Sequence, residues 1–532
     1  MNACEMGAND GASPLDSERF PSWLAALPQD STGVVARALT DELHKVRDLR
    51  EKIPARLRML ETCYKAATRL VGELEKRLGR SPLPLAQDLQ SDFIETNVLL
   101  KALASAYTAI VEEFSRKWIN LGYSRPFHLA TVRSIRLQAL RIELAYRVYA
   151  RGSAAAWTEL HRLYRLARMA GLASRKTQSM PLSVEQIYVG ALLLDFAEPN
   201  KFAPGELGWA RFYVERHARF AVLEGAQASK KGRLDEEACF LVKPGDGRAG
   251  RALVRAGRTP IEAGDMILNC GQLLARMQKQ IAGLEKGKEP AQLGLPLAAH
   301  LPQYRAMMQK LHRLWSTPPL RRYGRQKFKP RVDLVVGFDP LWSYLSGPAG
   351  RRRNDTLLPG VAISEWAIGN ESPDGFFLQH VSGNTASLCV GELVGLRARD
   401  KSTVFICLAR RVVSSDLQSL ELGLQNLASG GKPTMASIES TDKRGRKQAR
   451  TARVIILARL PGLGDGPALI APARTIASGM SVCLQQRGAT VRFRMGQPFE
   501  QSAGCEVFSL AAQVPAKVPS VRAHPAEVFH AS

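Results

Sequence analysis

The sequence predicts a multidomain α+β protein in which an all-α region precedes a β-rich region. Apolar residues recur at the spacing of amphipathic helices from about residue 31 to 223, for example at Val35, Leu39 and Leu43. Alternating or continuous apolar runs bounded by glycine and proline follow Pro319. The chain has 532 residues, which is enough for several domains with their own cores.

The helical region is expected to form a bundle or a stack of helical hairpins. Pro54 breaks the first periodic stretch, and prolines and glycines separate the later ones. No fixed-period repeat runs through these helices, so the sequence does not support a solenoid. The region from 225 to 257 is basic and glycine-rich, with one strand-like run at 238–242. Further helices are expected at about 92–121, 128–150, 154–172, 184–196, 204–222, 262–284 and 301–315.

The β-rich region divides into two sets of predicted strands. A basic loop, Lys443–Arg450, lies between the two sets, and Arg487-Gly488 marks a hairpin turn in the second. The first set is expected at 332–338, 361–368, 376–380, 390–399, 403–412 and 420–427. The second set, a smaller β-unit, is expected at 454–460, 467–471, 480–486, 489–495 and 506–513.

Two short motifs flank the first predicted strands and could form one binding site. Arg321, Arg322 and Arg325 precede the first strand, and an arginine fork can bind phosphate oxygens in pairs while its flat face stacks on a purine. The string Asn370-x-Ser372-x-x-Gly375 follows the second strand. Its amide and hydroxyl can bond to base edges or phosphate, and its glycine allows the backbone to come close.

The order of these motifs and strands resembles the PilZ domain, a bacterial receptor module for cyclic di-GMP. The resemblance covers Arg321–Leu427 and implies a six-stranded antiparallel β-barrel. It also implies that Arg321 and Arg325 clamp the ligand with help from Arg322, and that Asn370, Ser372 and Gly375 complete the site. The run Glu421-Leu422-Gly423-Leu424 resembles the closing strand of that family. Phe376 or Phe377 could flank a guanine, although the barrel interior is favoured for both.

The chain departs from the family pattern between Arg325 and Asn370, where it is longer. The excess resembles an insertion at Asp339–Gly360, which contains three consecutive arginines at 351–353. These arginines could add a phosphate contact, but a solvated loop is favoured. Asn370 also replaces the aspartate that is commoner in the family.

Composition limits the cellular context and the kinds of partner. The formal net charge is +25, and the surplus is spread over both halves of the chain, which favours polyanionic partners in general. The N-terminal stretch has no secretory signal, and no long uninterrupted apolar run predicts a membrane span. The eight cysteines form no close pairs. These features predict a cytoplasmic protein with reduced thiols.

No constellation in the sequence predicts catalysis. The glycine-rich strings at 462–466 and 430–434 lack the helix or the Ser/Thr that a nucleotide-binding loop needs. The nine histidines show no metal-binding spacing, and no nucleophile has a base at motif distance. The sequence therefore favours a receptor without a cofactor or metal over an enzyme.

The resulting functional hypothesis is a bacterial cyclic di-GMP effector in which the barrel senses the ligand and the helical region binds a protein partner. The resemblance implies control of motility, biofilm or polysaccharide. Because the helix at 301–315 ends shortly before Arg321, ligand capture could also change how that helix meets the barrel. Two alternatives remain open: a PilZ-fold scaffold without ligand, acting through protein contacts, and a nucleic-acid-binding protein that uses the basic loop at 443–450.

The predicted domain organisation has seven parts. They are a disordered leader at 1–30, an α-helical domain at 31–225, a basic linker with a short strand and two helices at 226–318, the PilZ-like barrel at 319–430, a basic loop at 431–450, a small β-unit at 451–515 and a tail at 516–532.

Overall fold

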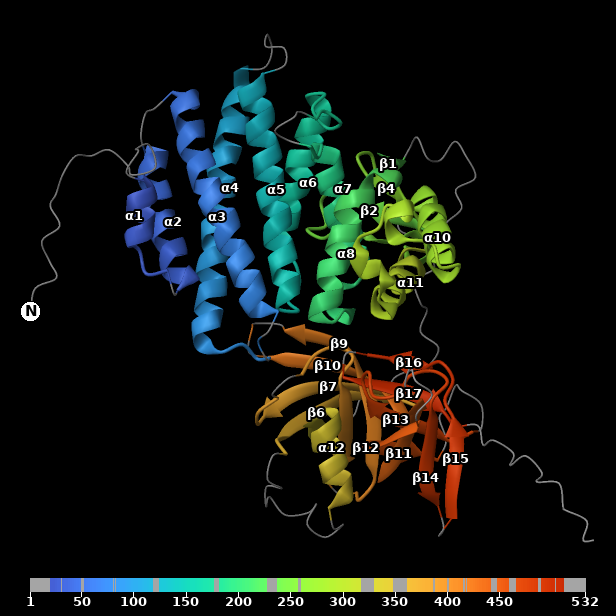
Figure 1. Cartoon of the computed structure of the whole chain (residues 1–532). Helices are drawn as coiled ribbons and strands as arrows, with labels where there is room; N and C mark the ends of the chain where they lie inside the picture. Colours follow the sequence, from blue (N-terminus) through green and yellow to red (C-terminus); the bar gives the residue numbers. More distant parts are fainter. Residues whose placement is uncertain are drawn as a thin grey trace, which may run out of the picture.

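A computed structural model gives the fold of the chain. It describes residues 20–29, 31–48, 52–79, 81, 83–117, 124–176, 181–226, 237–256, 260–316, 330–347, 361–385, 388–399, 401–414, 417, 419–441, 447–458, 466–486, 489–502 and 504–510. The predicted α+β class is confirmed, because helices come first and two β-units follow (Figure 1).

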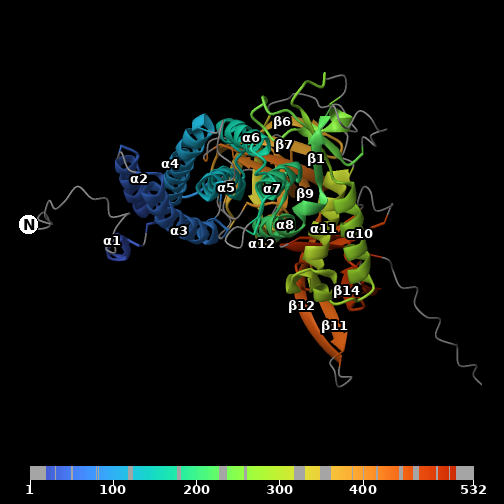
Figure 2. The same cartoon turned by 90° about the horizontal axis from the view of Figure 1, so that it is seen from above.

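The helical region is built from long antiparallel helices that lie side by side (Figures 1 and 2). A proline opens α3, α5 and α8, and a capping box between Ser183 and Gln186 opens α7. A helix already begins at Phe20, where the sequence predicted a leader. The helices are α1 (Phe20–Ala26), α2 (Thr32–Asp48), α3 (Ile53–Leu78), α4 (Gln87–Lys117), α5 (Arg125–Arg147), α6 (Ala154–Met169), α7 (Val184–Phe196) and α8 (Pro204–His217).

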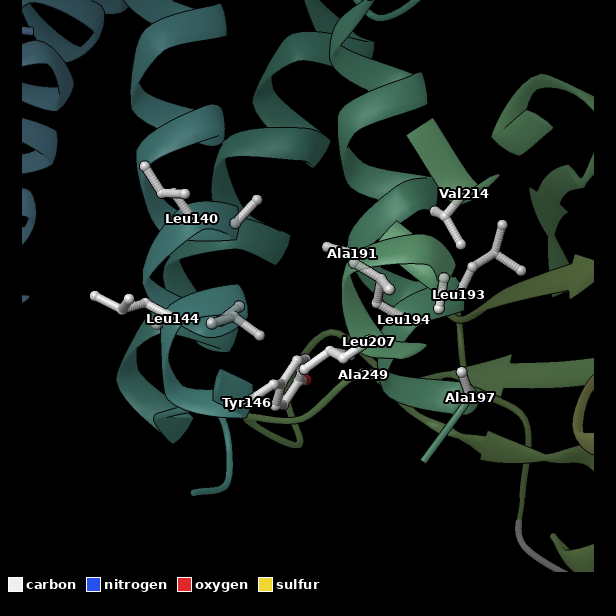
Figure 3. Packing of buried hydrophobic residues seen from close by; sticks show 14 of the residues in the cluster. Leu140, Leu144, Tyr146, Ala191, Leu193, Leu194, Ala197, Leu207, Val214 and Ala249 are labelled. Atoms are coloured by element: carbon white, nitrogen blue, oxygen red, sulfur yellow. The ribbon is translucent and has the colours of Figure 1, made fainter. Parts of the chain in front are cut away.

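The centre of this region is formed by α5 and α7. Both helices are buried along most of their length, and α7 is apolar on nearly every face, as expected for a helix surrounded by others. Leu140 and Leu144 of α5 and Ala191 and Leu194 of α7, all labelled in Figure 3, belong to one buried apolar cluster. The core therefore holds the helices together through close apolar packing.

One helix has the length and composition of a membrane span. Residues 87–116 of α4 have a mean hydropathy of 1.2 in their most apolar window, but half of that window is buried inside the fold. The helix packs against α2, α3 and α5. Its apolar character is thus explained by its position in the helical core.

The region predicted to be a basic linker is a small α+β layer that packs against the helices. Its four antiparallel strands have the order β1-β4-β2-β3, and the helix predicted at 262–284 is wrong in its first part, where a strand lies. Phe240 of this sheet stacks on Phe196 of α7 at 4.1 Å. The elements are β1 (Val222–Gly225), β2 (Cys239–Val242), β3 (Arg251–Ala252), β4 (Met266–Asn269), α10 (Gly271–Glu285) and α11 (Pro302–Ser316).

The predicted six-stranded barrel is confirmed. Six antiparallel strands close in the order β10-β7-β6-β5-β8-β9, and alternate residues such as Val332, Trp366 and Leu422 fill the interior. All six lie within a few residues of the predicted positions. They are β5 (Arg331–Val336), β6 (Ile363–Ser372), β7 (Gly375–Ser382), β8 (Leu393–Ala398), β9 (Val404–Ser414) and β10 (Leu420–Ala428).

The start of the predicted insertion forms a helix, α12 (Phe338–Ser346), that joins the two β-units. Leu341 is fully buried, and a Cβ atom on Gly395 of β8 would lie 2.4 Å from its Cδ1. The indole of Trp342 donates to the backbone oxygens of Thr434 and Val454 in the second unit, at 3.3 and 3.2 Å. The helix thus packs on the barrel wall with one side and on the second unit with the other.

The second β-unit is larger than predicted. It is a seven-stranded antiparallel sheet in the order β15-β14-β11-β12-β13-β17-β16. The basic loop predicted at 431–450 is wrong over most of its length, because β11 and β12 pair there as a long hairpin. The strands are β11 (Lys432–Thr441), β12 (Lys447–Leu457), β13 (Ala468–Pro472), β14 (Ser481–Gln486), β15 (Ala489–Arg494), β16 (Glu500–Gln501) and β17 (Cys505–Ser509).

The ends of the helices rest on the barrel. The amide of Ser414, at the end of β9, donates to the oxygen of Tyr149 at 3.1 Å, and the hydroxyl of Thr385 donates to the oxygen of Leu83. The short 3₁₀ helix η3 (Pro199–Lys201) contacts β9. The helical region and the barrel therefore share one continuous apolar core.

Candidate functional site

The string Asn370-x-Ser372-x-x-Gly375 forms the turn of the β6–β7 hairpin. Ser372 pairs with Gly375, and its hydroxyl donates to the Gly375 oxygen at 3.3 Å. Asn370 pairs with Phe377. The structure therefore brings the three residues of this predicted motif together at one end of the barrel.

A β-bulge near Gly369 decides where Asn370 points. Trp366 and Ile368 face the barrel interior, and simple alternation would send Asn370 inward as well. The bulge shifts the register between Ile368 and Asn370, so Asn370 lies opposite Phe377, a neighbour of the inward-facing Leu378. Asn370 and Phe377 consequently share the outer face, where they can meet a ligand.

Two glycines, Gly375 and Gly423, lie near Asn370 and carry no side chain. Gly375 lies so close to β10 that a Cβ atom there would be 1.9 Å from the Leu424 oxygen, which excludes any side chain. Gly423 of β10 pairs with Phe377 on one side and with Arg411 of β9 on the other. Gly375 therefore lets β7 lie close to β10, and Gly423 places no side chain between Phe377 and Arg411.

We call Asn370, Phe377, Gly423 and Arg411 the outer row, because they lie opposite one another across β6, β7, β10 and β9. Residues opposite one another in antiparallel strands share a face. Three strand spacings separate the ends of the row, or about 14 Å. The row offers an amide, an aromatic ring, a bare backbone and a guanidinium in succession.

The cationic end of the outer row contacts the helical region. With the Asn200 amide oriented to satisfy its neighbours, its oxygen accepts from Arg411 Nε at 2.7 Å. Asn200 belongs to η3. Next to Arg411, Arg410 binds Glu500 of the second β-unit with two bonds of 2.9 and 2.6 Å. Adjacent arginines of β9 therefore connect the barrel with both of its neighbours.

The predicted phosphate-binding arginines, Arg321, Arg322 and Arg325, lie outside the described residues, as do the three arginines at 351–353. The structure nevertheless fixes both ends of the segment that carries Arg321–Arg325. On one side, the Trp315 indole donates to the Leu193 oxygen at 3.0 Å, which anchors the end of α11.

On the other side, the chain enters the barrel beside the hairpin. The amide of Ile368 donates to the oxygen of Pro330 at 3.0 Å, and Arg331 pairs with Ala367. Pro330 therefore lies beside Ile368 of β6, which is two residues before Asn370. Since Arg325 is five residues before Pro330, the sequence gives it enough chain to reach the outer row.

The aromatic residues of β7 divide between the two faces. Phe376 contacts Phe405 edge to face, with ring centroids 5.3 Å apart, and faces inward as predicted. Phe377 faces outward, so the interior position favoured for it is wrong. Regular alternation along β7 is responsible, because Phe377 lies between the inward-facing Phe376 and Leu378. Arg411 was missed, because its position becomes meaningful only when β9 and β10 are in register.

Comparison with known proteins concerns the helical region. Residues 18–229 match the family described as "Cyclic-di-GMP receptor FimW, N-terminal domain". No curated protein and no solved structure matches the chain. The family match covers less than half of the chain and ends before the barrel. It indicates a cyclic di-GMP receptor, and thus a binding role, while the assignment of the barrel to the PilZ family stays a prediction.

Proposed function

We propose that this cyclic di-GMP receptor binds its ligand on the outer face of the barrel, between the arginines that precede β5 and the β6–β7 hairpin. The observation that carries the proposal is the position of Pro330 beside Ile368. It means that the residue at which the chain enters β5 lies beside the end of the strand that carries Asn370.

The chemistry of the outer row suits a cyclic dinucleotide. Such a ligand has two anionic phosphodiesters and two flat purines, and it needs cations, aromatic or guanidinium faces and room near the backbone. Asn370 and Ser372 supply amide and hydroxyl groups for a guanine edge or a phosphate oxygen. Gly423 places no side chain on the outer face, and Phe377 lies between Asn370 and Gly423 on the same face.

In this proposal Arg321 and Arg325 supply the phosphate contacts, with Arg322 beside them. Each charge-assisted hydrogen bond contributes roughly 1.5–3 kcal/mol. Arg411 lies at the far end of the outer row and makes the site reach toward the helical region.

In this proposal, ligand binding is relayed to a protein partner through the contacts between Arg411, η3 and α11. A ligand on the outer row that draws Arg411 away from Asn200 weakens a bond between the barrel and η3. The η3 helix is in turn bound to α11, because Lys310 donates to the Lys201 oxygen at 2.6 Å. The proposed output is a changed partner-binding surface on the helical region, in the cytoplasm, in control of motility, biofilm or polysaccharide.

The experiment is a calorimetric titration of the full chain with cyclic di-GMP. We expect Arg321→Ala and Arg325→Ala each to weaken binding by about ten- to over a hundredfold, at roughly tenfold per 1.4 kcal/mol. The double variant should show no measurable binding at ligand concentrations that saturate the wild type.

The matched control is Lys76→Ala/Lys101→Ala, which removes two positive charges from exposed positions on α3 and α4. It should keep the wild-type affinity. Equal losses in both double variants would show that only net charge matters. No binding by the folded wild type would favour the ligand-free scaffold.

A further inference from the structure

A cluster of arginines on the far side of the helical region has no evident role in the barrel site. Arg216 lies at the end of α8, Arg219 follows it in the 3₁₀ helix η4 (Ala218–Phe220), and Arg276 belongs to α10. None of the three forms an ion pair with a carboxylate among the residues that the structure describes. The first residues of α8 lie near the barrel, and its 14 residues span about 20 Å, so the cluster is remote from the outer row.

Two of the three arginines contact one aromatic ring. The Cζ atoms of Arg219 and Arg276 lie 5.0 and 4.5 Å from the centroid of Phe220. Their guanidinium groups are therefore within about 10 Å of each other, by the triangle inequality, and neither has a carboxylate partner in the described part of the chain. Like charges at such a separation repel, so an anion bound between them would relieve the repulsion.

A hydrogen-bonded platform holds the two helices in place behind the cluster. The Tyr213 hydroxyl donates to the Gln280 oxygen at 2.8 Å, and the Gln280 amide donates to His217 Nε2 at 3.2 Å and to the Leu293 oxygen at 3.0 Å. Burial, with a smaller contribution from Arg276, Arg216 and Arg219, lowers the pKa of His217 to about 4. The ring is thus neutral, and all three arginines are near it.

Two buried polar atoms in this corner have no hydrogen-bond partner among the residues that the structure describes. They are the Tyr304 hydroxyl of α11 and Arg276 Nε. Tyr304 is fully buried, and Arg216 is close enough to affect its pKa, which burial raises to about 12. A buried hydroxyl without an acceptor costs roughly 1–3 kcal/mol. The cluster therefore holds three cations and one unpaired hydroxyl donor.

We infer that Arg216, Arg219, Arg276 and Tyr304 form a second anion site, which binds the phosphoryl group of a phosphomonoester. A phosphomonoester dianion has three free oxygens and close to two negative charges, so it can bind several guanidinium groups at once. A carboxylate has one charge and binds a single fork. The Phe220 face can also receive a flat group attached to the phosphoryl group.

The test is thermal unfolding of the full chain in inorganic phosphate, with chloride added to hold the ionic strength constant. At 20 mM phosphate we expect the melting temperature of the wild type to rise by at least about 2 °C, because a ligand that binds only the folded state stabilises it. Arg216→Gln/Arg219→Gln should abolish the rise. The control Lys76→Gln/Lys101→Gln, which loses the same charge, should keep it.

The variant Tyr304→Phe distinguishes phosphate binding by the Tyr304 hydroxyl from a purely structural role of that hydroxyl. Without phosphate the variant should melt no lower than the wild type, because the hydroxyl has no partner to lose. With phosphate its rise in melting temperature should be smaller than in the wild type. An equal rise in the wild type and in the arginine variant would overturn the inference, as would an equal rise with glutamate.

O-phosphoserine and GMP distinguish the sources of the phosphoryl group. Equal rises in melting temperature with the two compounds indicate that the phosphoryl group alone is bound, as on a modified side chain. A larger rise with GMP indicates a nucleotide that stacks on Phe220. Because these measurements contain no cyclic di-GMP, the inference can fail while the proposed barrel site stands, and the reverse also holds.

Discussion

At the scale of single residues, Gly375 is the most constrained position of the candidate site. A methyl group there would meet the Leu424 oxygen at 1.9 Å, so Gly375→Ala must push β7 away from β10. We expect a loss of more than about 1 kcal/mol in the free energy of unfolding and weaker cyclic di-GMP binding. Chemical denaturation and calorimetry measure the two effects.

The matched control for Gly375→Ala is Gly496→Ala in the second β-unit, where a Cβ atom meets nothing within 4 Å. It should leave both stability and affinity close to those of the wild type. Wild-type affinity in a folded Gly375→Ala protein would contradict the placement of the ligand beside this hairpin.

His217 makes the stability of the helical region depend on pH. Burial places its pKa in the folded chain at about 4, below the ordinary 6.5, so the unfolded chain binds more protons between these values. The contribution, on the order of 3 kcal/mol, is fully present above pH 6.5 and is lost as the pH falls toward 4. Urea denaturation at pH 7.5 and 4.5 should show a smaller difference for His217→Gln than for the wild type.

The control for this measurement is His300→Gln, at a side chain that is half exposed. It should leave the wild-type difference between the two pH values unchanged. If His217→Gln also leaves it unchanged, His217 is not the group responsible.

Single residues also show where sequence reasoning stops. Asn370, Ser372 and Gly375 were predicted together because they belong to one short turn, and local spacing suffices for that. Arg411 was not predicted, because its face depends on an irregularity in the pairing of β9 with β10, and Phe377 was assigned to the wrong face. The predicted roles of Arg321, Arg322 and Arg325 stay predictions.

At the scale of elements, α12 is the connection between the barrel and the second sheet. Leu341 is fully buried between them, so Leu341→Ala should lower the free energy of unfolding by about 2–5 kcal/mol. Because the helix contacts both units, thermal unfolding should show both becoming less stable together. Leu297→Ala, at a side chain that is 81 % exposed, is the control and should change little. An effect on only one unit would contradict the connecting role of α12.

The helices and barrel strands were largely predictable because their apolar residues follow the helical or alternating period closely. The strand β4 was predicted as part of a helix, since its four residues, Met266–Asn269, run directly into α10. The β11–β12 hairpin was predicted as a basic loop, because polar and basic residues on its open face hide the alternation. Pairing with neighbouring strands decides such segments, and a single sequence does not reveal it.

At the scale of the whole molecule, the family match and the proposed ligand site lie in different parts of the chain. Residues 18–229 carry the receptor match, while the outer row belongs to the barrel. The contacts of Tyr149, Asn200 and Leu83 with the barrel join the two parts. A ligand on the barrel can therefore act on the helical region through contacts that already exist.

Hydrogen exchange of the full chain with and without saturating cyclic di-GMP tests this account most directly, because it locates the ligand. We expect slower exchange in β6 and β7 and in the segment that carries Arg321 and Arg325, together with changed exchange around η3. The Arg321→Ala/Arg325→Ala variant should show none of these changes. Slower exchange confined to the helical region, with the barrel unchanged, would contradict the account and move the ligand site there.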